Sequence, residues 1–142
     1  MSAENEVRAA SSKFYAALNR MANGEAGPMA NVWVTGPQAS AHHPIGGRDL
    51  TYETVVASFG KVAEIASGGE IQITDQIIDV GGDMAVETGV EIGNLVIAGH
   101  EASIHHRVTN VYRKGEDGWR LQHHHADLSP AMLEILEKLS AA

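Results

Sequence analysis

A run of three histidines, His123-His124-His125, is the feature of this sequence with the clearest capacity for chemistry. The run follows a glycine-containing turn, which predicts that it lies on the returning strand of a β-hairpin. Because side chains alternate between the faces of a strand, His123 and His125 should share one face with Leu121 and Asp127, and His124 should lie on the other. Buried polar groups are costly unless they have partners, so we expect the shared face to line a pocket. The alternative is that these histidines lie on an open, solvated strand.

A second group of residues favours acid–base chemistry. His43 directly precedes Pro44, and the ordinary pKa of a histidine suits a general base near neutral pH. Tyr15 and Asn110 are neutral hydrogen-bond donors, which could stabilise a carbonyl oxygen that is becoming an enolate. The three side chains together predict proton abstraction next to a carbonyl, as in isomerisation, dehydration or aldol-type cyclisation. The alternative is that Tyr15 packs in the core and that His43 only ends a strand.

A metal site is a further interpretation of the histidines. His106 has the same parity as Asn110 on the preceding strand, so it should face His123 and His125. Three imidazoles can hold zinc with one open water position. The alternative, which we favour, is a pocket without cofactor in which the histidines bond to protein groups. The residues that we expect to contact a substrate are Trp33, His106, Val108, Tyr112 and Asp127.

Composition restricts the class of protein. A chain of 142 residues with 44% hydrophobic residues is long enough for a single domain, residues 1–142, with its own core. The absence of cysteine excludes disulfides and thiol nucleophiles. Ten basic against eighteen acidic residues argue against a nucleic-acid partner. Because neither a membrane-spanning run nor a secretion signal is evident, we expect a cytoplasmic protein that does not contact a membrane.

The apolar pattern predicts helices first and a long sheet afterwards. Apolar residues at three- and four-residue spacing indicate helices over residues 4–21, 51–66 and 130–139, with a short helix between Pro28 and Trp33. The predicted strands are an edge strand over residues 35–45 and four long strands over 71–80, 84–97, 102–112 and 119–127. Strands that follow one another in a meander are antiparallel. The sequence therefore predicts an α+β fold with helices packed on one face of the sheet.

This order of elements resembles the nuclear transport factor 2-like fold, a cone-shaped, strongly curved antiparallel sheet wrapped around N-terminal helices. The segments that carry the resemblance are Trp33-Val-Thr with His43-Pro-Ile-Gly-Gly47, Arg107-Val-Thr-Asn-Val-Tyr-Arg113, and Gly118-Trp-Arg-Leu-Gln-His-His-His125. They are similar to the SnoaL-like polyketide-cyclase and ketosteroid-isomerase-like families. The last two segments are also similar to the association domain of calcium/calmodulin-dependent kinase II. A fold of this kind hosts enzymes, binding proteins and assembly modules.

The resemblance to ketosteroid isomerases implies roles for particular residues. Their oxyanion-binding tyrosine corresponds to Tyr15, in Tyr15-Ala-Ala-Leu18. Their general-base aspartate corresponds to His43, and their protonated aspartic acid corresponds to Asn110. Because both acidic residues are replaced, the resemblance does not imply steroid isomerisation by that chemistry. The triple histidine also loosely resembles the end strand of iota-class carbonic anhydrases, although Ala126-Asp127 follows where that family would have two serines.

These observations predict a small-molecule pocket protein that acts on a carbonyl or polyketide-like compound without a cofactor. His43 would be the base, Tyr15 and Asn110 the donors, and His123 or His125 a second acid. The alternative is a non-catalytic ligand-binding or oligomerisation module, and a zinc or carbonic-anhydrase-like hydration site is a more distant alternative. Interspersed apolar and polar residues on the outer sheet face predict a homodimer through that face.

Overall fold

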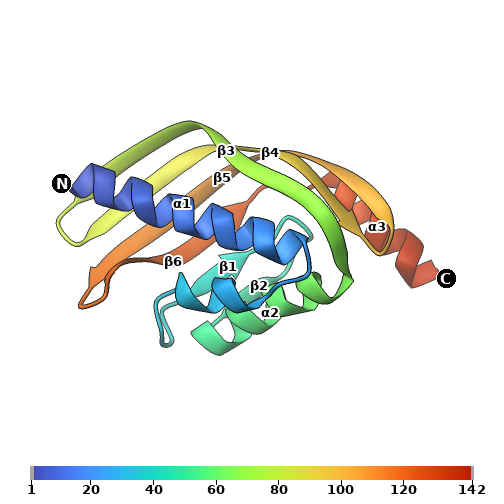
Figure 1. Ribbon diagram of the computed structural model, residues 1–142, viewed down its shortest axis with the longest axis horizontal. Coiled ribbons are helices and arrows are strands. Elements are labelled where there is room, and N and C mark those ends of the chain that lie inside the picture. Colours follow the sequence, from blue (N-terminus) through green and yellow to red (C-terminus); the bar gives the residue numbers. More distant parts are fainter. Residues whose placement is uncertain (1, 142) are drawn as a thin grey trace.

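The computed structural model describes residues 2–141, and Figure 1 shows a long curved sheet with the N-terminal helix along its concave side. The helical elements are α1 (Ala3–Ala22), η1 (Gly27–Asn31, a 3-10 helix), α2 (Tyr52–Ile65) and α3 (Pro130–Ala141). The strands are β1 (Ser40–His42), β2 (Arg48–Leu50), β3 (Ala66–Gly81), β4 (Met84–Ile97), β5 (His100–Gly115) and β6 (Gly118–Ala126). Within residues 2–141, no helix has the length and apolar character that a membrane span requires.

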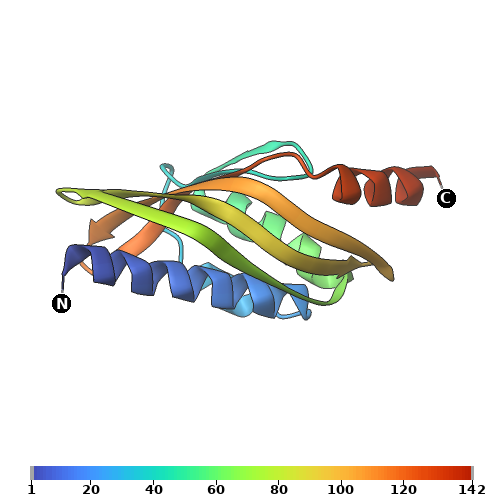
Figure 2. The ribbon, with the colours of Figure 1, turned by 90° about the horizontal axis from the view of Figure 1, so that it is seen from above.

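The six strands form one sheet in the order β2-β1-β6-β5-β4-β3. Neighbouring strands are antiparallel except β1 and β6, which pair in parallel. Figure 2 shows α1 running beneath the sheet, while α3 extends beyond one end of it. The predicted α+β cone is therefore confirmed. One detail differs, because only residues 40–42 of the expected 35–45 strand pair in the sheet, and β2 takes the edge.

The apolar face of α1 forms the centre of the core. The Ser2 side chain accepts a hydrogen bond from the backbone nitrogen of Asn5 and caps the helix start. Phe14 is fully buried, and its ring packs edge-on against the indole of Trp33, with ring centroids 6.3 Å apart. The phenyl ring of Phe59 from α2 lies 5.9 Å from the same indole. This cluster joins both helices to the sheet and fixes the distance between them.

A β-bulge in β6 decides which histidines face the core. His123 pairs with Val111, but Leu121 pairs with Tyr112, so Gln122 is an extra residue in β6. An extra residue reverses the facing of every side chain that follows it. Leu121 and His124 are therefore both buried on the inner face, whereas His123 and His125 lie on the outer face. The prediction that His123 and His125 share the face of Leu121 is wrong for this reason.

Candidate functional site

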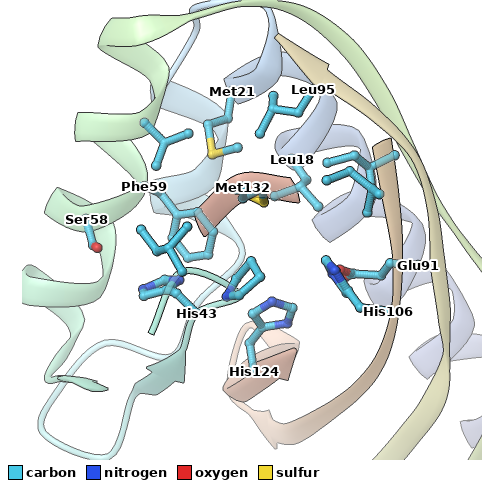
Figure 3. Close-up of a pocket in the computed structure, with 15 residues that line it drawn as sticks. Leu18, Met21, His43, Ser58, Phe59, Glu91, Leu95, His106, His124 and Met132 are labelled. Carbon is cyan, nitrogen blue, oxygen red and sulfur yellow. The ribbon is translucent and has the colours of Figure 1, made fainter. Parts of the chain in front are cut away.

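A small cavity lies between α1, α2, the concave face of the sheet and the start of α3 (Figure 3). Its volume is about 60 Å³, which is room for a few water molecules or a very small ligand. The apolar part of the wall includes Leu18, Phe59, Leu95 and Met132. The polar side chains that reach the cavity are His43, Ser58, Glu91, His106 and His124. A larger ligand therefore needs the apolar side chains to move aside.

Glu91 and His106 form a buried pair in the cavity wall. The Nε2 atom of His106 lies 2.6 Å from Oε1 of Glu91, and the Tyr15 hydroxyl donates to Oε2 at 2.8 Å. Burial by itself would raise the pKa of Glu91, but the hydrogen bond from His106 and the neighbouring His124 lower it overall. Glu91 is therefore a carboxylate, and Nε2 of His106 donates to it.

The other ring nitrogen of His106, Nδ1, is buried and has no hydrogen-bond partner among residues 2–141. Buried polar atoms in folded proteins are nearly always paired, because an unpaired one costs the free energy of its lost hydration. His106 lines the cavity, so this nitrogen is a polar atom of the wall whose hydrogen bonding the described residues leave incomplete.

His124 presents a hydrogen-bond acceptor to the same cavity. The amide nitrogen of Asn110 donates to Glu87 at 2.9 Å and to the Tyr15 hydroxyl at 3.1 Å, which leaves the amide oxygen facing His124. Nδ1 of His124 lies 2.6 Å from that oxygen, so it must be the protonated nitrogen and Nε2 carries the lone pair. Burial, partly opposed by Glu91, lowers the pKa of His124 to about 4. The ring is thus neutral at pH 7.

His43 forms a second histidine–carboxylate pair on the opposite wall. It directly follows β1, and its Nε2 atom lies 2.6 Å from Oδ2 of Asp49 on β2. The imidazole packs edge-on against Phe59, with ring centroids 5.2 Å apart. No hydrogen bond in the described part of the chain uses Nδ1 of His43. A carboxylate that holds one nitrogen of an imidazole while the other is free is the arrangement of a general base in acyl-transfer enzymes.

Of the predicted site residues, only His43 and His106 line the cavity. Tyr15, Asn110 and Tyr112 lie behind its wall, where their donor groups are already bonded to the buried carboxylates of Glu87 and Glu91. The prediction that Tyr15 and Asn110 point their donors into the pocket is therefore wrong in geometry. Trp33 and Val108 are buried outside the cavity wall.

The remaining predicted residues lie on the outer face of the sheet. Asp127 accepts a hydrogen bond from Nε of Arg107 at 2.7 Å, and the Arg107 side chain is 83% exposed. The predicted zinc ligands are separated by the sheet, because His106 faces inward and both His123 and His125 face outward. These three cannot bind one ion, and the bulge in β6 is the cause.

Sequence reasoning missed Glu91, Asp49 and the inward direction of His124. Glu91 carried a usable signal, because it has the same strand parity as Leu95 and Ile97 and so belongs to an apolar face. An acidic residue on such a face needs a buried partner. His124 carried no comparable signal, since its direction depends on the bulge.

The low pKa of His124 predicts a loss of stability in mild acid. Its ordinary value is 6.5 and its folded value is about 4, so between these values the unfolded chain binds a proton that the folded chain does not. Stability should fall by about 2–3 kcal/mol as the pH drops from 7 to 4.5. Urea unfolding at pH 7 and at pH 4.5 measures this loss of stability. His124→Gln should remove most of this pH dependence and His100→Gln, at an exposed position, should retain it; equal dependence in both variants would contradict the assignment.

Three solved structures share this fold at low sequence identity. A proposed dehydratase of the nuclear transport factor 2-like family from Streptomyces avermitilis is 24% identical, with a TM-score of 0.77 over 89% of this chain and 96% of that one. A proposed calcium/calmodulin-dependent protein kinase type II association domain from Thiobacillus denitrificans is 25% identical, with a TM-score of 0.71 over 85% and 93%. A nuclear transport factor 2-like superfamily protein from Salmonella enterica is 17% identical, with a TM-score of 0.78 over 89% and 91%.

A comparison with curated protein sequences found no match. A family model does match, and it describes the SnoaL-like domain. The match runs over residues 7–132, which include most of α1, the whole sheet and the beginning of α3. The chain therefore belongs to the SnoaL-like domain family.

Proposed function

We propose that the protein is an acid–base catalyst for a small, largely apolar carbonyl compound, from which it eliminates water or in which it shifts a double bond. The observation that carries this proposal is the presence of two histidine–carboxylate pairs, His43–Asp49 and His106–Glu91, at one small apolar cavity. Both reactions require one group that removes a proton and another that supplies one. The name of the Streptomyces avermitilis relative, a proposed dehydratase, is in keeping with the first reaction.

In the proposed reaction, Nδ1 of His43 takes a proton from the carbon next to the carbonyl, and the carbonyl becomes an enolate. Asp49 stabilises the imidazolium that forms. In an elimination, the enolate re-forms the carbonyl and expels the β-hydroxyl group, which takes a proton from Nδ1 of His106 and leaves as water. In an isomerisation, the same proton goes to the γ carbon instead. This step takes His106 in its doubly protonated form, with the Glu91 carboxylate offsetting the charge. Proton exchange with water then returns both imidazoles to their starting states.

Tyr15 and Asn110 then act as positioning residues. Tyr15 donates to Glu91 and Asn110 accepts from His124, so each holds a residue that reaches the cavity. The neutral His124 accepts a hydrogen bond from a substrate hydroxyl through Nε2. This division of roles differs from the oxyanion-binding pair that the resemblance to ketosteroid isomerases implies.

Hydrogen–deuterium exchange tests the proposal without knowledge of the natural substrate. Small ketones, β-hydroxy ketones and β,γ-unsaturated ketones are incubated with the protein in D₂O, and NMR follows loss of the proton next to the carbonyl. We expect exchange above the buffer rate, together with enone formation from the compounds that can form one. His105→Ala is a matched control, because His105 neighbours His106 but faces outward. A protein that binds these compounds without exchange or turnover would contradict the catalytic proposal.

An assembly module is the second candidate, favoured by the similarity to the Thiobacillus denitrificans association domain. Light scattering of the purified protein separates the two functions. The catalytic proposal expects a homodimer through the outer sheet face, where Ile77 and Val86 are exposed large apolar side chains. A ring larger than a dimer would favour the assembly module.

A further inference from the structure

The outer face of the sheet carries a histidine cluster that the cavity chemistry does not use. β1 and β6 pair in parallel, with Ser40 opposite His123 and His42 opposite His125. The ring centroid of His42 lies 4.9 Å from that of His123 and 4.7 Å from that of His125. One ring nitrogen from each of the three histidines lies within 4.8 Å of the other two. The bulge that turns His124 inward is what brings His123 and His125 beside His42.

We propose that His42, His123 and His125 bind a divalent transition-metal ion, zinc above all, on the outer face of the sheet. Imidazole nitrogen is a preferred ligand of zinc, at a Zn–N distance of about 2.0–2.1 Å in tetrahedral geometry. Tetrahedral angles at that distance place the ligand nitrogens about 3.4 Å apart. The three nitrogens therefore need to approach by little more than an ångström, which side-chain rotation supplies. A water molecule takes the fourth position.

The surroundings of the cluster favour metal binding. The Ser40 hydroxyl lies 2.7 Å from Nδ1 of His123, which fixes the ring and leaves Nε2 for the ion. Hydrogen bonds of this kind orient the ligands of many metal sites. Partial burial first, and then the neighbouring imidazoles, lower the pKa of His123, and the same causes together with Arg48 lower that of His42. Neutral imidazole is the form that coordinates metal.

Metal binding would also tie β1, which carries His42, to β6, which carries His123 and His125. β1 has three residues, and its partner β2 is equally short. His42 is the last residue of β1, and the next residue, His43, lines the cavity. A metal ion on His42 therefore restrains the backbone that carries His43. Metal binding itself can be measured without a turnover assay.

Metal titration of untagged, chelator-treated protein tests this proposal. We expect one zinc ion per chain in competition with a chromogenic chelator, and a visible absorption band typical of tetrahedral Co²⁺ when cobalt replaces zinc. His42→Ala and His125→Ala should each weaken zinc binding at least about 100-fold, and Ser40→Ala about 10-fold, since loss of an orienting partner costs about 10–100-fold. His100→Ala, at an exposed histidine outside the cluster, is the matched control and should bind as the wild type does.

Three results would overturn the proposal. The first is no stoichiometric binding at micromolar zinc. The second is equal zinc affinity in the wild type and in the His42→Ala and His125→Ala variants, with circular dichroism showing that all are folded. The third is loss of zinc binding in the His106→Gln variant, which would show that the ion binds in the cavity and not on the outer face. Because none of these readings depends on catalysis, failure of the metal site and failure of the proposed function are distinguishable.

Discussion

Replacing His43 with alanine should lower kcat for proton exchange next to a carbonyl by about 10²–10⁴-fold, the usual contribution of a positioned general base. The imidazole lines the cavity, Asp49 holds its Nε2 atom at 2.6 Å, and its Nδ1 atom remains free to take a proton. Alanine removes the proton acceptor and leaves the apolar wall in place. KM should therefore change much less than kcat. The NMR exchange assay measures both.

Asp49→Asn separates a catalytic His43 from a merely structural one. An asparagine amide can still bond to the imidazole, but it does not stabilise an imidazolium and it allows the wrong tautomer. We expect a loss of kcat approaching that of His43→Ala, with unchanged stability. His105→Ala, on the outer face, should keep full activity. Full exchange in His43→Ala combined with its loss in His106→Gln would assign the base to His106 instead.

The helices and long strands were predictable because their signals are local. The apolar spacing predicted a helix over residues 4–21, and α1 spans Ala3–Ala22. The four long predicted strands likewise correspond to β3, β4, β5 and β6. Strand parity was equally informative along β5, where His106 and Asn110 face inward and Arg107 faces outward. Patterns of period two or 3.6 depend only on neighbours in the chain.

The site was less predictable because it depends on the register between strands. Gln122 is the extra residue of a bulge, and nothing in its local sequence marks it as one. That single residue reversed the expected directions of His123, His124 and His125. Pairing of His43 with Asp49 and of His106 with Glu91 depends in the same way on which strands meet. Types of residue could be predicted from the sequence, but not the partners that determine their roles.

Gly93→Ala should destabilise the fold by about 2–5 kcal/mol. The backbone at this position has a conformation that disfavours a side chain, and there is no space for one. Gly93 lies in β4 opposite Ile71 of β3, with φ +147°, a conformation that favours glycine. A Cβ atom there would lie 1.8 Å from the carbonyl oxygen of Glu70 on β3. Since that contact is with backbone, relief requires β3 and β4 to separate at this point.

Urea unfolding measures this loss, and Gly82→Ala is the matched control. Gly82 lies in the hairpin between β3 and β4, also at positive φ (+62°), but a Cβ atom there meets nothing within 4 Å. Gly82→Ala should lower the stability only by the free energy needed to place alanine in a left-handed backbone conformation, about 1–2 kcal/mol. Equal losses in the two variants would mean that the close approach of the strands is not what Gly93 provides. A larger loss at Gly93 would link the close approach of β3 and β4 to the site, because Glu91 lies two residues away in the same strand. Separation of the strands there would displace the carboxylate that holds His106.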